Sequence, residues 1–205
     1  NRSVEKSEKW LAEYQGQYLK DLQSVPSDTH AIITCVGNDK DLRELYLGEH
    51  GFVTHAPKGC LLIDHTTSSA NVAQEVNRLA IEKGSLWLDA PVSGGTIGAE
   101  DASLAIMVGG DEKIFNECFD LLKILGNPTL VGPVSSGQIS KLANQIIVGV
   151  TIGAVAEAVT LCEKSGTNPS KMIKALSGGW ADSKILQTHG KRMIIKDFSP
   201  AFQAL

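Results

Sequence analysis

Four polar side chains near the start of a long apolar segment form the pattern in this sequence that is most suggestive of chemistry. Gln138, Lys141, Asn144 and Gln145 follow one another at spacings that place them on one face of a helix. From Leu142 to Ala156 the sequence contains no charged residue. A buried ammonium group costs free energy unless it has a partner. The pattern therefore predicts either a lysine that exchanges protons in a buried site or one whose stem packs while its head reaches water.

Three further polar segments follow predicted buried strands. They are Gly37-Asn38 after the strand from Ala31 to Val36, Thr66-Thr67 after the strand from Cys60 to Asp64, and Ser93-Gly94-Gly95 after the strand from Leu86 to Asp89. In open α/β sheets, ligands bind beyond the carboxyl ends of the strands. The backbone N–H groups of a Ser-Gly-Gly turn can bind a carboxylate. The same three residues are also common in plain turns, so this motif alone leaves both interpretations open.

The elements that must position these residues alternate between strand and helix up to about Gly132. Two more strands are predicted at Leu104–Val108 and Thr129–Val131, and helices at about 4–18, 39–47, 70–83 and 111–125. This alternation is typical of parallel βαβ units and a doubly wound sheet. Beyond Gly132 every pattern is helical. We therefore expect an α/β domain over residues 1–133 and an all-helical domain over residues 134–205, joined by a long interdomain helix.

Composition excludes several other classes of protein. The 205 residues are 42% hydrophobic and 20% charged, which is typical of a soluble globular chain. The net charge of −4 does not suggest a nucleic acid or an anionic membrane as partner. The four cysteines form no C-x-x-C pair and the five histidines have no metal-ligand spacing, so we expect no metal and a cytoplasmic location. The uncharged stretch is shorter than the roughly 20 residues that span a bilayer.

Two long motifs link these segments to a known family. The sequence D-A-P-V-S-G-G stands at Asp89–Gly95, and G-x-x-G-x-G-x-x-x-K-x-x-N corresponds to Gly132–Asn144, with Ser135 in place of the middle glycine. In these motifs the chain resembles the β-hydroxyacid dehydrogenases, which include 3-hydroxyisobutyrate dehydrogenase and tartronate semialdehyde reductase. The resemblance implies a Rossmann-type fold and a nicotinamide cofactor.

The resemblance also implies a role for particular residues. Lys141 corresponds to the catalytic general acid and base, and Ser93, Gly94, Gly95 and Asn144 to the substrate-binding residues. Cofactor contacts are implied for Asn1, Arg2 and Ser3 at the adenosine ribose, for Val36 and Gly37 at the nicotinamide side, and for Thr67 in a segment that touches the cofactor. Gly37 stands where the family has a proline. Arg2 can accept the 2′-phosphate of NADP, so we expect NADP, with NAD as the alternative.

The expected activity is hydride transfer between the nicotinamide and a small 3-hydroxy acid or its semialdehyde, in a homodimer or homotetramer. The alternatives are a non-catalytic dehydrogenase-like oligomerisation module and an imine reductase, a group of the same architecture that generally lacks the lysine. The sequence contains no G-x-G-x-x-G loop, so we expect it to be a fragment that lacks the family's first strand and C-terminal end. Gly149 and Gly153 share a helix face, which predicts the close approach of a helix from the same chain or from a second subunit.

Overall fold

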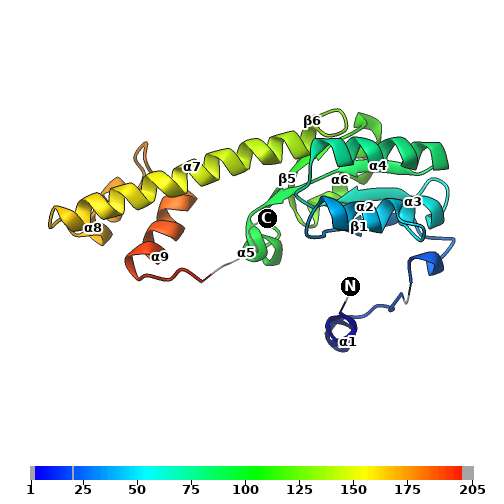
Figure 1. Cartoon of the computed structure of the whole chain (residues 1–205), viewed down its shortest axis with the longest axis horizontal. Helices are drawn as coiled ribbons and strands as arrows, with labels where there is room; N and C mark the ends of the chain where they lie inside the picture. Colours follow the sequence, from blue (N-terminus) through cyan, green and yellow to red (C-terminus); the bar gives the residue numbers. More distant parts are fainter. Residues whose placement is uncertain (1–2, 20, 200–205) are drawn as a thin grey trace. The chain divides into compact units, whose positions relative to one another are not determined.

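The computed structural model describes residues 3–19 and 21–199 (Figure 1). The chain divides into two compact units, of which one ends at Lys141 and the other begins at Leu142. The first unit contains the strands and the second is helical. The predicted domain boundary, between residues 133 and 134, lies a few residues before this division.

A six-stranded sheet is the centre of the first unit. Its strands are β1 (Ala31–Thr34), β2 (Leu61–Asp64), β3 (Leu86–Asp89), β4 (Val92–Ser93), β5 (Leu104–Gly109) and β6 (Gly126–Gly132). They lie in the order β1-β2-β3-β5-β4, with β6 paired to β5. The first three strands are parallel, and the α/β fold class is confirmed.

The second half of the sheet runs in the opposite direction, which the sequence analysis did not anticipate. β5 pairs antiparallel with β3 at Asp89 and Gly109, and β6 runs parallel to β5. The reason lies in the segment that joins β3 to β5. Its short strand β4 pairs antiparallel with β5, so the chain turns back as in a hairpin and makes no crossover of the kind that parallel strands need.

Helices cover both faces of this sheet. They are α2 (Asp39–Leu47), α3 (Phe52–His55) and α4 (Ala70–Lys83) on one face and α6 (Glu112–Lys123) on the other. The first unit also contains α1 (Val4–Glu13), which has no buried residue, α5 (Gly95–Glu100) and a 3₁₀ turn η1 (Leu22–Ser24). Leu62 and Trp87 pack in one core with residues of α2, α3 and α4. Their strand neighbours Ile63 and Leu88 pack in another core with residues of α6. Because successive strand residues face opposite sides, the sheet is the middle layer of three.

The second unit consists of helices alone. They are α7 (Ser136–Lys164), whose first residues belong to the first unit, α8 (Pro169–Leu176), the π-helical turn η2 (Leu186–Gly190) and α9 (Lys191–Ile194). Asn168 caps α8 by accepting a hydrogen bond from the N–H of Lys171. Val155 and Val159 of α7 pack with Ile173 and Leu186 in a small core. Only the part of α7 that carries these valines is therefore covered by α8 and η2.

The middle of α7 does not have the close neighbour that its glycines predict. A Cβ atom built at Gly149 or Gly153 meets no atom within 4 Å among the described residues, and Ile146 and Val150 are exposed. The contact with a helix of the same chain is therefore not found.

The apolar part of α7 is also long. One 18-residue window of this helix has a mean hydropathy of 1.8, and 11% of that window is buried. Contrary to expectation, α7 could cross a membrane by length and composition, but one such helix is weak evidence because core helices pass the same test.

Candidate active site

The first turn of α7 is anchored by the carboxylate of Asp89, at the end of β3. The Oδ1 atom of Asp89 accepts a hydrogen bond of 2.7 Å from the N–H of Ser135, and Oδ2 accepts one of 2.9 Å from the N–H of Gln138. These N–H groups have no partner within the helix itself. Asp89 is completely buried, so this side chain fixes where α7 begins on the sheet.

Two glycines make room for this carboxylate. A Cβ atom at Gly109 would lie 2.6 Å from Oδ1 of Asp89, and one at Gly137 would lie 2.8 Å from Oδ2. Both distances are too short for any side chain. The close approach of Asp89 therefore explains why the second motif has a glycine at position 137. Burial raises the pKa of Asp89 to about 6, although the N–H groups of Ser135 and Gln138 oppose this by stabilising the charged form.

Lys141 lies one helical turn after Gln138 on the same helix. Its exposed fraction is 8%, and it forms no ion pair or hydrogen bond with any described residue. Burial lowers the pKa of its ammonium group, because removal from water penalises the charged form. These properties favour the first of the two interpretations of the polar stripe, a lysine that exchanges protons in a buried site.

Ser135 shows why the family motif has a glycine at this position. Its φ angle is +77°, in the left-handed region that side chains other than glycine rarely adopt. The Ser135 hydroxyl accepts a hydrogen bond of 3.2 Å from Nε2 of Gln74. The turn into α7 therefore keeps the geometry of a glycine turn but stores strain in a serine.

Replacing Ser135 with glycine is expected to raise the free energy of unfolding by about 0.5–1 kcal/mol, because the relieved strain exceeds the loss of one weak hydrogen bond. Urea unfolding measures this change. Ser136→Gly is the matched control, because Ser136 is the first residue of α7 and glycine in a helix costs about 0.5–1 kcal/mol. A loss of stability in Ser135→Gly as large as that in Ser136→Gly would contradict the strain.

The predicted substrate turn leads from β4 into α5, a few residues after the end of β3. Ser93 ends β4, and Gly94 and Gly95 have φ angles of +142° and +67°. A Cβ atom at Gly94 would come within 3.0 Å of Leu104, so this turn requires glycine for both conformation and space. Its residues are half-buried or exposed. Asn144 lies in the second unit, three residues after Lys141 on α7, and its amide donates a hydrogen bond to Oε1 of Gln145.

A buried hydrogen-bond chain shapes the ends of β1 and β2. The Tyr46 hydroxyl is 2.7 Å from Oγ1 of Thr34, and the hydroxyls of Thr34 and Thr66 both donate to Oδ1 of Asp64. Oγ1 of Thr66 in turn accepts a hydrogen bond of 2.9 Å from the N–H of Val36. The loop after β1 and the loop after β2 are thereby joined at the residues predicted to contact the nicotinamide.

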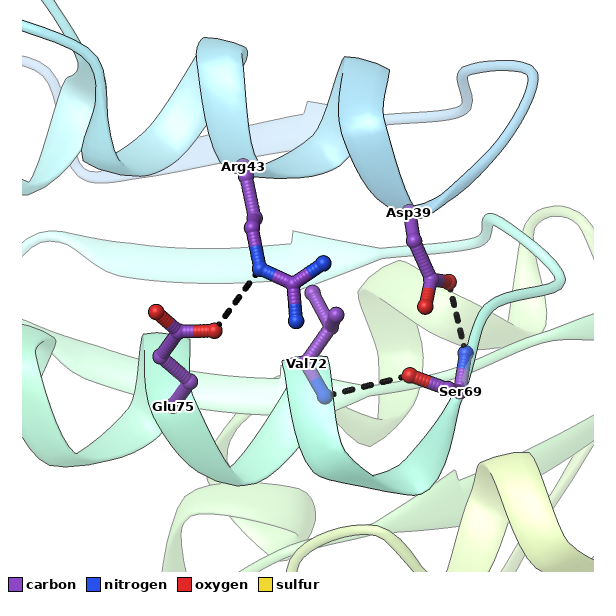
Figure 2. Close-up of polar contacts among 5 residues, drawn as sticks. All are labelled: Asp39, Arg43, Ser69, Val72 and Glu75. Atoms are coloured by element: carbon purple, nitrogen blue, oxygen red, sulfur yellow. Dashed lines mark hydrogen bonds and ion pairs between the residues drawn. The ribbon is translucent and has the colours of Figure 1, made fainter.

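The helices that follow these two loops are also joined (Figure 2). The carboxylate of Asp39 accepts a hydrogen bond of 2.8 Å from the N–H of Ser69, whose hydroxyl caps α4 by accepting one from the N–H of Val72. Further along the same two helices, Arg43 pairs with Glu75 at 2.9 Å. That pair is exposed and contributes little by itself, but the buried and capping contacts hold both loops in one arrangement.

The predicted cofactor residues fit a nicotinamide as far as the structure describes them. A Cβ atom at Gly37 would lie 3.0 Å from Oδ2 of Asp41, and the Thr67 hydroxyl has no hydrogen-bond partner among the described residues. Around it, Oδ2 of Asp64, Nε2 of His65 and Oγ of Ser68 are buried without a partner in the described part of the chain. This edge of the sheet therefore holds buried polar atoms whose hydrogen bonds the described residues do not satisfy. Ser3 precedes α1, whereas Asn1 and Arg2 lie outside the described residues.

Sequence reasoning missed the roles of Asp89 and Gln138, although both stand inside the quoted motifs. Residues 3–19 and 21–199 contain no cluster of three or more side chains that could hold a metal ion.

The fold and the site define a dinucleotide-binding α/β unit that carries a buried lysine on the helix leading into a helical unit. Residues 1–132 match the family profile for the NAD-binding domain of 6-phosphogluconate dehydrogenase, and residues 135–205 match the profile for NAD-binding of NADP-dependent 3-hydroxyisobutyrate dehydrogenase. The chain belongs to the β-hydroxyacid dehydrogenase family, whose members use a nicotinamide cofactor.

Individual relatives agree with this membership. The chain is 41% identical over 182 residues to the 2-hydroxy-3-oxopropionate reductase of Escherichia coli, covering 88% of this chain and 62% of the relative. It is 39% identical to an uncharacterized oxidoreductase of Bacillus subtilis, covering 98% of this chain and 70% of that one. The solved structure of Mycobacterium tuberculosis 3-hydroxyisobutyrate dehydrogenase with L-serine superimposes with a TM-score of 0.75 at 31% identity, covering 84% of this chain and 58% of that one. The chain thus spans about three fifths to seven tenths of the lengths of these relatives.

Proposed function

We propose that this protein is an NADP-preferring oxidoreductase that interconverts a small 3-hydroxy acid and its semialdehyde. The observation that carries the proposal is Lys141, which is buried, unpaired among the described residues and one turn beyond the anchor that Asp89 provides. Two relatives support the substrate class. One is named for 2-hydroxy-3-oxopropionate, a semialdehyde with a carboxylate, and the other was solved with L-serine, a 3-hydroxy acid.

In the proposed reaction, the bound cofactor supplies or accepts the hydride at the hydroxyl-bearing carbon. The N–H groups of the Ser93-Gly94-Gly95 turn bind the substrate carboxylate, and the Asn144 amide orients it. The ammonium of Lys141 donates a proton to the carbonyl oxygen during reduction, and the neutral amine accepts the proton during oxidation. A lowered pKa brings these two forms of Lys141 toward equal population at neutral pH, where acid–base catalysis is most effective.

The experiment that tests this proposal is the oxidation of NADPH in the presence of a panel of small aldehydes and imines. We expect turnover with semialdehydes that carry a carboxylate, and little with the matching aldehydes that lack it. Turnover of cyclic imines in place of semialdehydes would indicate an imine reductase. No turnover of any compound, together with normal cofactor binding, would indicate a non-catalytic module.

The cofactor preference is assigned to Arg2. Removing its guanidinium in Arg2→Ala is expected to weaken kcat/KM with NADPH by roughly 10- to 150-fold and to leave NADH almost unaffected, because only NADPH carries the 2′-phosphate. The ratio of kcat/KM for the two cofactors measures this effect. Arg78→Ala is a control, because Arg78 forms an exposed ion pair within α4. Equal losses for both cofactors would rule out the role of Arg2.

We further propose a homodimer or homotetramer and a cytoplasmic location, with no nucleic acid or membrane as partner. The exposed, uncharged face of α7 around Gly149 and Gly153 supports a contact with a second copy, because exposed apolar surfaces of this kind are typical of protein–protein contacts. The molar mass in solution tests the assembly.

A further inference from the structure

We propose that Gln138 is a positioning residue, which clamps the backbone on both sides of Thr67 to the turn of α7 that precedes Lys141. The clamp would set the position of the cofactor-contact loop relative to the proton-donating lysine. This inference rests on the proposed function, because it concerns how that site is held together.

The clamp consists of two hydrogen bonds made by one side-chain amide. Oε1 of Gln138 accepts a hydrogen bond of 2.9 Å from the N–H of Ser68, and Nε2 donates one of 2.8 Å to the carbonyl oxygen of Thr66. Thr66 and Ser68 flank Thr67, whose hydroxyl remains free of contacts with the described residues. The two bonds therefore hold the backbone of Thr67 and leave its side chain available.

The same residue is joined to the beginning of the substrate motif. Its backbone N–H donates to Oδ2 of Asp89, which directly precedes the segment that leads to the Ser-Gly-Gly turn. Gln138 is completely buried, and Lys141 follows three residues later on the same helix. One residue thus connects the cofactor-contact loop, the start of the substrate loop and the lysine-bearing turn, and all of these contacts lie within the first unit.

Glutamine is suited to this place because its neutral amide supplies a donor and an acceptor at the same time. A methionine has a similar length but can replace neither bond, so Gln138→Met would leave a buried N–H and a buried carbonyl without partners. The segment 66–68 would then shift to find other partners. A shift of about 1 Å in a reacting group can lower a rate by about 10²-fold.

The test uses Gln138→Met in the full chain, with Gln74→Met as the matched control. Gln74 is exposed and donates a hydrogen bond to the Ser135 hydroxyl, so the control also removes a glutamine contact at the start of α7. The first measurement is hydrogen exchange of the Ser68 amide in the cofactor-free protein. Exchange is expected to be at least about tenfold faster in Gln138→Met, because the protecting bond is gone, and unchanged in Gln74→Met.

The second measurement separates positioning from a merely structural role. In the folded Gln138→Met variant, the Kd for NADPH is expected to rise about tenfold, the loss of about one hydrogen bond. At saturating NADPH, kcat is expected to fall by about 10- to 100-fold, while the KM for the semialdehyde changes less than about threefold. Gln74→Met should keep the parent values.

If Gln138→Met does not fold, Gln138→Asn takes its place, because asparagine keeps the neutral amide but is one methylene too short to make both bonds. The expected changes have the same direction and are smaller. Unchanged exchange of the Ser68 amide would overturn the clamp, and faster exchange with unchanged Kd and kcat would overturn its positioning role. Failure of the proposed function is a different result, namely no turnover by the parent protein, and the exchange and Kd measurements then still decide for or against Gln138.

Discussion

Replacing Lys141 with alanine is expected to lower kcat by about 10²–10⁴-fold, the range for a positioned acid–base group. The physical reason is that the buried amine of Lys141 is the group proposed to exchange the proton, and alanine has no such group. The Kd for NADPH should be nearly unchanged. Steady-state kinetics with the best semialdehyde measure kcat, and fluorescence titration measures Kd.

Lys164→Ala is the matched control, because Lys164 ends the same helix and is exposed. It should keep the kcat of the parent. The fold of Lys141→Ala should also survive, because removing a buried ammonium removes a desolvation cost. A folded Lys141→Ala variant that keeps most of its kcat would refute the assignment of the proton donor.

The second large effect is expected in the pH dependence of stability at Asp89. Its folded-state pKa of about 6 lies above the ordinary value of 3.8. A carboxyl group with a raised pKa contributes stability that is fully present below the unfolded pKa and is lost as pH rises through the folded pKa. The parent should therefore lose about 3 kcal/mol relative to Asp89→Asn as pH rises from about 3.5 to 6.5.

Urea unfolding of both proteins at a series of pH values measures this difference, and most other titrating groups cancel in it. Above about pH 7 the difference should be constant, because the carboxyl group is then ionised in both the folded and the unfolded state. A difference that instead grows in favour of the parent as pH rises would mean that the N–H donors of Ser135 and Gln138 outweigh burial.

Much of the fold could be predicted from the sequence because local patterns determine it. Alternating strands and helices gave the α/β class, and capping residues such as Asn38 and Asn168 stand where α2 and α8 begin. The reversed direction of β5 could not be predicted, because it depends on the pairing of the two-residue strand β4. So short a strand has no detectable period.

The sequence predicted which residues belong to the candidate site, but not which of them contact one another. Lys141 was identified from its motif and its apolar surroundings. The roles of Asp89 and Gln138 depend on contacts with residues 46 to 72 positions away, and a single sequence gives no information on such pairs. The spacing of Gly149 and Gly153 predicted a closely packed helix, but no described residue of the same chain lies within 4 Å of either position, so only the contact with a second subunit stays a prediction.

The central claim is that this protein transfers hydride to a carboxylate-bearing semialdehyde. The most direct measurement uses NADPH deuterated at both C4 positions, with 2-hydroxy-3-oxopropionate as the first substrate and mass spectrometry of the product. We expect one deuterium in each product molecule, on the carbon that bears the new hydroxyl group. A product without deuterium, or the absence of any product while NADPH binds normally, would contradict this account.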